Sequence, residues 1–145
     1  MQILFLDDNP ERHKKFRTLS IGCSVDFVWN AAEAIEKLSD KENEYDLIML
    51  DHDLDVEKQD MLLEDEEDGR YVARHLATLV DFRKNSHVVI HSLNYNGGLD
   101  MQDILTKAGF ENVTHLPFGW RMFRKTDNGC EFVPDDKKWG SDVSL

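Results

Sequence analysis

The chain has 145 residues, of which 41% are hydrophobic and 32% are charged, and its formal net charge is −12. We expect one globular domain with its own core, and no apolar run approaches the roughly 20 residues that cross a bilayer. The acidic excess argues against general DNA binding, which depends on lysine and arginine, but permits a phosphorylated substrate because a bound cation can reverse a site's charge.

Short apolar segments alternate with helical patterns, which is typical of βα units around a parallel sheet. The predicted strands are 3–6, 25–29, 47–50, 88–90 and 113–116. The predicted helices run from 10 to about 19, from Asn30 to about 38, from Asp68 to about 80, and through 104–105 to Gly109. Gly97-Gly98 is expected to be a loop before the last of these helices.

The sequence pattern changes after Pro117. Segments 120–125 and 130–133 flank Asp127-Asn128-Gly129, which predicts a β-hairpin. We therefore expect an α/β domain over residues 1–118, with a hairpin and tail over 119–145 appended to the same domain. Cys23 and Cys130 match no metal-binding spacing, and we expect them to be reduced thiols in a cytoplasmic protein.

The stretch 55–68 is strongly acidic and is interrupted by Met61-Leu62-Leu63. The simplest interpretation is a solvated loop. The alternative is a lid over a cation site, where its charge would repel polyanionic substrates. No EF-hand spacing is present, so specific calcium binding is not expected.

Polar side chains follow three of the predicted strands. Asp7 and Asp8 end the first, Asp51-His52-Asp53 the third, and His91-Ser92 the fourth. Ligands of open parallel sheets bind at this edge, and carboxylates that meet there repel one another unless a cation or proton intervenes. Oxygen ligands of this kind suit Mg²⁺ or Mn²⁺. We predict a metal site at Asp7, Asp8 and Asp51, with Asp53 as a further ligand or as a partner that orients a histidine.

Two histidines, His52 and His91, adjoin the predicted metal ligands. A phosphodiester hydrolase needs a group that gives a proton to the leaving oxygen near neutral pH, and histidine does this readily. Asn94 can donate hydrogen bonds to a phosphoryl oxygen. Strand alternation turns His52 away from its neighbouring aspartates, which favours His91 as the proton donor. We expect structural roles for the other four histidines, which are His13, His75, His87 and His115.

Two segments, Leu4-Phe5-Leu6-Asp7-Asp8 and residues 45–51, resemble the receiver domain of two-component response regulators. The resemblance implies a five-stranded α/β fold and a Mg²⁺ site at the three aspartates, with Asp51 at the phospho-acceptor position. It also places Ser92 where receivers carry a hydroxyl residue. Receivers have a lysine at the end of the fifth strand, whereas this chain has Leu116-Pro117-Phe118. The missing lysine argues against ordinary phospho-relay signalling.

Further motifs resemble the cyclic-phosphate-processing receiver-like family. They are Leu50-Asp51-His52-Asp53-Leu54, residues 68–73, and His91-Ser92-Leu93-Asn94 followed by Gly97 and Met101. The resemblance spans about residues 1–118, and it implies action on a cyclic phosphate. The chain departs from the family pattern at Asp55, where a glycine is usual, and in its long acidic insert.

These observations predict a flavodoxin-like three-layer sandwich with sheet order 2-1-3-4-5 and a C-terminal hairpin. The predicted function is a metal-dependent phosphoesterase that acts on a cyclic nucleotide or on a 2′,3′-cyclic RNA end. Asp7, Asp8 and Asp51 would hold the cation, His91 and His52 would handle protons, and Ser92 and Asn94 would bind phosphate. The alternatives are a non-catalytic module that binds a nucleotide or a partner protein, and an atypical phospho-acceptor at Asp51.

Overall fold

The structure, a computed structural model, describes residues 1–54, 68–117, 119–127 and 129–133. Five parallel strands form its central sheet in the order β2-β1-β3-β4-β5, and two further strands form an antiparallel hairpin. The strands are β1 (Gln2–Leu6), β2 (Ser24–Val28), β3 (Leu47–Leu50), β4 (His87–Ile90), β5 (Val113–His115), β6 (Phe123–Thr126) and β7 (Gly129–Phe132). The predicted fold class, strand order and hairpin are confirmed.

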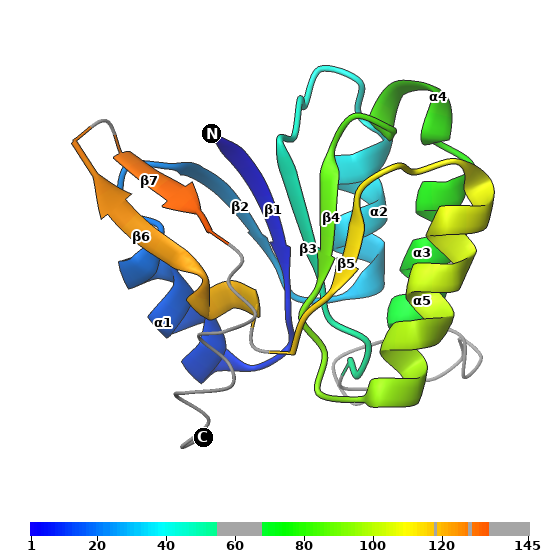
Figure 1. Ribbon diagram of the computed structural model, residues 1–145, viewed down its shortest axis with the longest axis horizontal. Coiled ribbons are helices and arrows are strands. Elements are labelled where there is room, and N and C mark those ends of the chain that lie inside the picture. The colour runs from blue at the N-terminus through cyan, green and yellow to red at the C-terminus, as the bar shows by residue number, and fades with distance from the viewer. Residues whose placement is uncertain (55–67, 118, 128, 134–145) are drawn as a thin grey trace.

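Helices cover one face of the sheet, and a helix with the hairpin covers the other (Figure 1). The elements are α1 (Pro10–Leu19), α2 (Ala31–Ser39), α3 (Gly69–Ala77), α4 (Val80–Arg83), α5 (Tyr95–Ala108) and the 3-10 turn η2 (Gly119–Arg121). Alternate strand residues supply two cores: Leu4 and Ile48 face α2, α3 and α5, while Phe5 and Met49 face α1 and the hairpin. None of the helices in the described part is long and apolar enough to span a membrane.

Side-chain caps begin the four longer helices. Asn9 accepts hydrogen bonds from two backbone amides of α1, and Asn30 accepts one from Glu33. Asp68 caps α3 and Asn94 caps α5 in the same way. These caps satisfy amides that the first turn of a helix leaves without a partner. They also fix where each loop at the carboxyl edge of the sheet enters its helix.

Two predicted boundaries are wrong. Gly97-Gly98 belongs to the first turns of α5 rather than to a loop, because Asn94 starts that helix. A Cβ atom on Gly97 would lie 2.5 Å from the His52 ring, so the glycine serves close packing. The helix predicted from Asp68 to about 80 is broken after Ala77, where the Thr78 backbone amide donates to the carbonyl of His75 instead of continuing the helix.

The acidic stretch 55–67 and the tail 134–145 lie outside the described residues, and so do Phe118 and Asn128. The interpretations of the acidic stretch as a solvated loop or a lid therefore stay predictions.

The hairpin is tied to the sheet by a disulfide between Cys23 and Cys130, whose Cα atoms are 6.1 Å apart. The expectation of two reduced thiols is therefore wrong for this structure: the sequence separation of 107 residues hides the fact that the fold brings the start of β2 against β7. Phe123 of β6 also packs edge-on against Phe16 of α1, with ring centroids 4.9 Å apart. The hairpin thus packs with α1 in the core on this face of the sheet.

We expect Cys130→Ser to lower the free energy of unfolding by about 2 to 4 kcal/mol, because the disulfide restricts a long loop in the unfolded chain. Thermal melts with and without a thiol reductant measure this. Reductant should lower the melting temperature of the wild-type protein to that of Cys130→Ser, and leave the Cys23→Ser/Cys130→Ser double variant unchanged. A wild-type melting temperature that does not respond to full reduction would contradict this role.

Candidate metal and phosphate site

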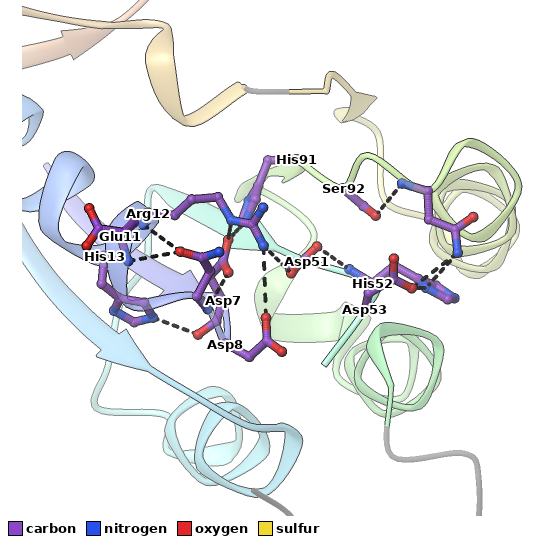
Figure 2. A network of polar contacts seen from close by, with 12 residues as sticks. Asp7, Asp8, Glu11, Arg12, His13, Asp51, His52, Asp53, His91 and Ser92 are labelled. Atoms are coloured by element: carbon purple, nitrogen blue, oxygen red, sulfur yellow. Dashed lines mark hydrogen bonds and ion pairs between the residues drawn. The ribbon is translucent and has the colours of Figure 1, made fainter. Parts of the chain in front are cut away.

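Three carboxylates meet at the carboxyl edge of the sheet (Figure 2). Asp7 and Asp8 follow β1, and Asp51 follows the neighbouring strand β3. One oxygen from each lies within 4.8 Å of the others. Asp7 and Asp51 are buried, whereas the side chain of Asp8 is partly exposed. The fold therefore brings together the three aspartates that the sequence predicts as metal ligands, and we call them the carboxylate cluster.

Arg12 of α1 extends into the carboxylate cluster. Its Nε donates a hydrogen bond of 2.8 Å to Oδ2 of Asp7. Its Nη2 lies 3.5 Å from Oδ2 of Asp51 and 3.9 Å from Oδ1 of Asp8. Arg12 is not among the site residues predicted from the sequence. The available signal was its position four residues after Asp8, in the first turn of a helix that Pro10 begins, which returns the side chain over the end of β1.

Two histidines hold Asp7 from different sides. Nε2 of His91, at the end of β4, lies 3.0 Å from Oδ2 of Asp7, and Nε2 of His13 lies 2.6 Å from the backbone oxygen of Asp7. The His91 ring is buried and stacks on Phe5 with centroids 5.0 Å apart and planes 6° apart. Within the described residues, no hydrogen-bond partner reaches Nδ1 of His91. His91 is thus placed beside the carboxylate cluster, as predicted, with its Nε2 directed at a carboxylate.

The two buried carboxylates of the cluster have pKa values shifted in opposite directions. Burial, together with the charges of Asp7 and Asp8, raises the pKa of Asp51 to about 7, although His91 and Arg12 act against the shift. Burial also acts to raise the pKa of Asp7, but the hydrogen bonds and charges of His91 and Arg12 outweigh it and hold the pKa below its ordinary value. His91 and Arg12 thus offset the charge of Asp7, whereas burial and the neighbouring carboxylates still disfavour the charged form of Asp51.

The His52 ring belongs to a second polar group, directed away from the carboxylate cluster (Figure 2). Its Nδ1 lies 2.7 Å from Oδ1 of Asp53, and its Nε2 lies 3.7 Å from Oδ2 of Asp68. Only the backbone of His52 contacts the cluster, because its amide donates to Oδ1 of Asp51 at 2.9 Å. Strand alternation indicated this orientation. The sequence placed both histidines at one phosphate; the structure gives them different neighbours.

Asp53 lies outside the carboxylate cluster, and its side chain is 67% exposed. It contacts His52 and accepts a hydrogen bond of 3.2 Å from Nδ2 of Asn94. Burial acts to raise the pKa of Asp53, but the hydrogen bonds from His52 and Asn94 prevail and lower it. Of the two roles that the sequence left open for Asp53, the contacts favour orienting a histidine.

Ser92 and Asn94 follow β4, and the Asn94 side chain joins His52 and Asp53 in the second polar group, which we call the His52 group. The Ser92 hydroxyl is buried and accepts the backbone amide of Asn94 at 3.0 Å, which leaves its own proton to donate. The Asn94 side chain accepts from Gly97 and donates to Asp53. Ser92 therefore retains a donor for a phosphoryl oxygen, whereas the Asn94 amide already holds the start of α5 against the His52 group.

The carboxylate cluster fits a hard divalent cation. Oxygens that share a six-coordinate Mg²⁺ at about 2.1 Å lie no more than about 4.2 Å apart, so a spread of 4.8 Å needs only small side-chain rotations. All three ligands are carboxylate oxygens, the type that Mg²⁺ and Mn²⁺ prefer. Asp7, Asp8 and Asp51 would hold the ion, and the raised pKa of Asp51 reflects its burial together with the neighbouring negative charges that the ion would offset.

Comparison with known families identifies what this arrangement belongs to. The model of the cyclic-phosphate processing receiver domain matches residues 2–107, which include the carboxylate cluster, both site histidines, Ser92 and Asn94. The chain belongs to this family. A search of the curated proteins finds no match.

Solved structures with similar folds are receiver and signalling proteins. A sensor protein from Polaromonas sp. JS666 is 21% identical, with a TM-score of 0.57 over 81% of this chain and 82% of that one. The signal receiver domain of a Luxo repressor protein from Vibrio parahaemolyticus is 17% identical, with a TM-score of 0.55 over 83% and 81%. A response regulator from Burkholderia pseudomallei, solved with a phosphorylated aspartic acid, calcium ion and citrate, is 17% identical, with a TM-score of 0.51 over 78% and 58%. These likenesses establish the receiver fold.

We expect Asp51→Asn to raise the free energy of unfolding at pH 8, with a chelator present, by about 1 to 3 kcal/mol, because the amide removes a buried charge and its repulsion with the neighbouring carboxylates. The pKa of Asp51 is about 7 in the folded protein and 3.8 ordinarily. The unfolded chain therefore loses this proton at lower pH than the folded protein, and the free energy of unfolding falls as pH rises from about 4 to 7. The advantage of Asp51→Asn should therefore shrink as pH falls. Melts at pH 5.5 and pH 8 measure it, and an equal or larger advantage at pH 5.5 would refute this account.

Proposed function

We propose that this protein hydrolyses a cyclic phosphate ester on a small molecule such as a cyclic nucleotide. The observation that carries the proposal is the contact of His91 with Asp7, which puts an imidazole beside a carboxylate cluster suited to a cation. A receiver that only accepts a phosphoryl group has no need of a proton donor there. The match to the cyclic-phosphate processing receiver family supports the same substrate class.

The carboxylate cluster is the proposed cation site. A Mg²⁺ or Mn²⁺ ion held there would neutralise charge on the phosphoryl oxygens and lower the pKa of an attacking water. Burial of Asp7 and Asp51 keeps water away from the cluster and strengthens the attraction for a cation. The hydrogen bond from the His52 amide to Asp51 fixes the orientation of that carboxylate.

His91 is the proposed proton donor. In the reaction, a water oxygen forms a bond to phosphorus, and the bond from phosphorus to one ester oxygen of the ring breaks. The leaving oxygen takes a proton from His91 in its imidazolium form, and the proton released by water converts the neutral imidazole back to the imidazolium, so the product is a phosphomonoester with one free hydroxyl. Stacking on Phe5 and the contact with Asp7 fix the ring, which keeps the proton at a defined position.

Ser92 and the His52 group form the proposed binding side of the site. The Ser92 hydroxyl donates to a phosphoryl oxygen, because its contact with the Asn94 amide uses only a lone pair and leaves its proton to donate. His52, Asp53 and Asn94 hold the beginning of α5 beside this hydroxyl. On these contacts, His52 and Asn94 position the segment between β4 and α5 that carries Ser92, and His91 carries the proton.

The receiver fold supports two other functions. A buried Asp51 within the carboxylate cluster also suits a phospho-acceptor, although the end of β5 carries Leu116-Pro117 in place of the receiver lysine. Incubation with a small phosphodonor and Mg²⁺, followed by intact-mass measurement, tests it: an added phosphoryl group that is absent in Asp51→Asn would establish an acceptor. A non-catalytic module would bind a nucleotide or partner protein without turnover.

We expect hydrolysis of at least one member of a panel of cyclic mononucleotides, 2′,3′-cyclic phosphates and cyclic oligonucleotides with Mg²⁺ or Mn²⁺. His91→Gln should reduce kcat by about 100-fold or more, because general acid catalysis contributes that much. His87→Gln is the matched control, since His87 lies at the other end of β4 and contacts Thr114. Phosphorus NMR or chromatography of the products measures turnover. No turnover on any substrate, or full activity in His91→Gln, would exclude the proposed hydrolase.

A further inference from the structure

Arg12 contacts all three aspartates of the carboxylate cluster. It comes from α1, on the opposite side of β1 from β4 and β5. The receiver lysine would come from the end of β5, where this chain has Leu116 and Pro117. In the described part of the chain, α1 therefore places a positive charge at the carboxylate cluster, whereas the end of β5 carries no lysine.

The two ends of the guanidinium are held with different strength. Nε is fixed to Asp7 at 2.8 Å, whereas Nη2 makes only long contacts of 3.5 Å to Asp51 and 3.9 Å to Asp8. The side chain is 25% exposed, so it lies at the mouth of the site. Arg12 thus has one anchored nitrogen and one side that is loosely bound and close to solvent.

A divalent cation would compete with that loosely bound side. The carboxylates near Nη2 belong to Asp8 and Asp51, and both are proposed ligands of the ion. The cation and the guanidinium repel each other, so loading the ion weakens the long contacts of Nη2. A planar guanidinium released from carboxylates presents paired N–H donors that match two oxygens of a phosphate.

We propose that Arg12 binds the phosphoryl group of the ligand, in the role that receivers give to the lysine after β5. The inference rests on the proposed function for the identity of the site as a phosphate site. The proposal also couples the two ligands. Without phosphate, the charge of Arg12 weakens cation binding; with phosphate bound, Arg12 and the cation both contact the phosphoryl oxygens. Cation and phosphate therefore strengthen each other's binding, by the same factor in both directions.

Binding of Mg²⁺ alone and of inorganic phosphate at saturating Mg²⁺ tests the proposal on the full chain, by calorimetry and phosphorus NMR. Arg12→Ala should bind Mg²⁺ about three- to tenfold more tightly than the wild type without phosphate, and bind phosphate at least about tenfold more weakly. Arg12→Lys should recover part of the phosphate affinity, because it keeps the charge but loses the paired donors.

Lys14→Ala is the matched control, because it removes one positive charge from an exposed position of the same helix. Both binding constants should stay within about twofold of the wild type. Equal phosphate affinity in Arg12→Ala and wild type, or no phosphate binding to the wild type with Mg²⁺, would overturn the proposal. Phosphate binding that depends on Arg12 in a protein without turnover would support Arg12 while excluding the hydrolase.

Discussion

Repulsion between buried carboxylates governs the arrangement of side chains at the carboxyl edge of the sheet. Asp7 and Asp51 end neighbouring parallel strands and are almost fully buried, so their charges meet in a region with little water to separate them. Arg12 and His91 offset the charge of Asp7, and the pKa of Asp51 remains high. The cluster is thus incompletely neutralised by the described residues, which is the property that a cation site requires.

The packing beneath the cluster keeps this arrangement rigid. The His91 ring stacks on Phe5, and Phe5 stacks on Phe16 with centroids 4.3 Å apart and planes 8° apart. Phe16 in turn meets Phe123 of the hairpin edge-on. The hairpin thus supports, through three aromatic contacts, the histidine that holds Asp7. The hairpin lies outside residues 2–107, which match the family, but this chain of aromatic contacts connects it to the site.

The sequence predicted those features that depend on local patterns. Strands that end in aspartate place the carboxylate cluster, because the carboxyl ends of parallel strands share one edge. Asn30 with Glu33 and Asp68 predicted helix starts, because capping depends on a few consecutive residues. The turn around Asp127 predicted the hairpin for the same reason.

Features that depend on how elements pack could not be read from the sequence. Arg12 reaches the cluster only because α1 folds back over the end of β1, and the Cys23–Cys130 disulfide forms only because the hairpin lies against β2. Gly97 indicated a loop by residue type, yet it lies in the helix that Asn94 begins, and the His52 ring occupies the space where a side chain would project. The separation of His52 from His91 was partly foreseeable, since strand alternation turns successive side chains apart.

Amide NMR spectra recorded during a titration with paramagnetic Mn²⁺ show whether a divalent cation binds at the carboxylate cluster. We expect the amide signals of Asp8, Arg12 and His52 to broaden first, while those of Asp46 and Ser86, which precede β3 and β4 at the opposite ends of these strands, stay sharp. Asp51→Asn should abolish this selectivity. Uniform broadening, or broadening that begins at other acidic residues and is unchanged in Asp51→Asn, would contradict cation binding at the cluster.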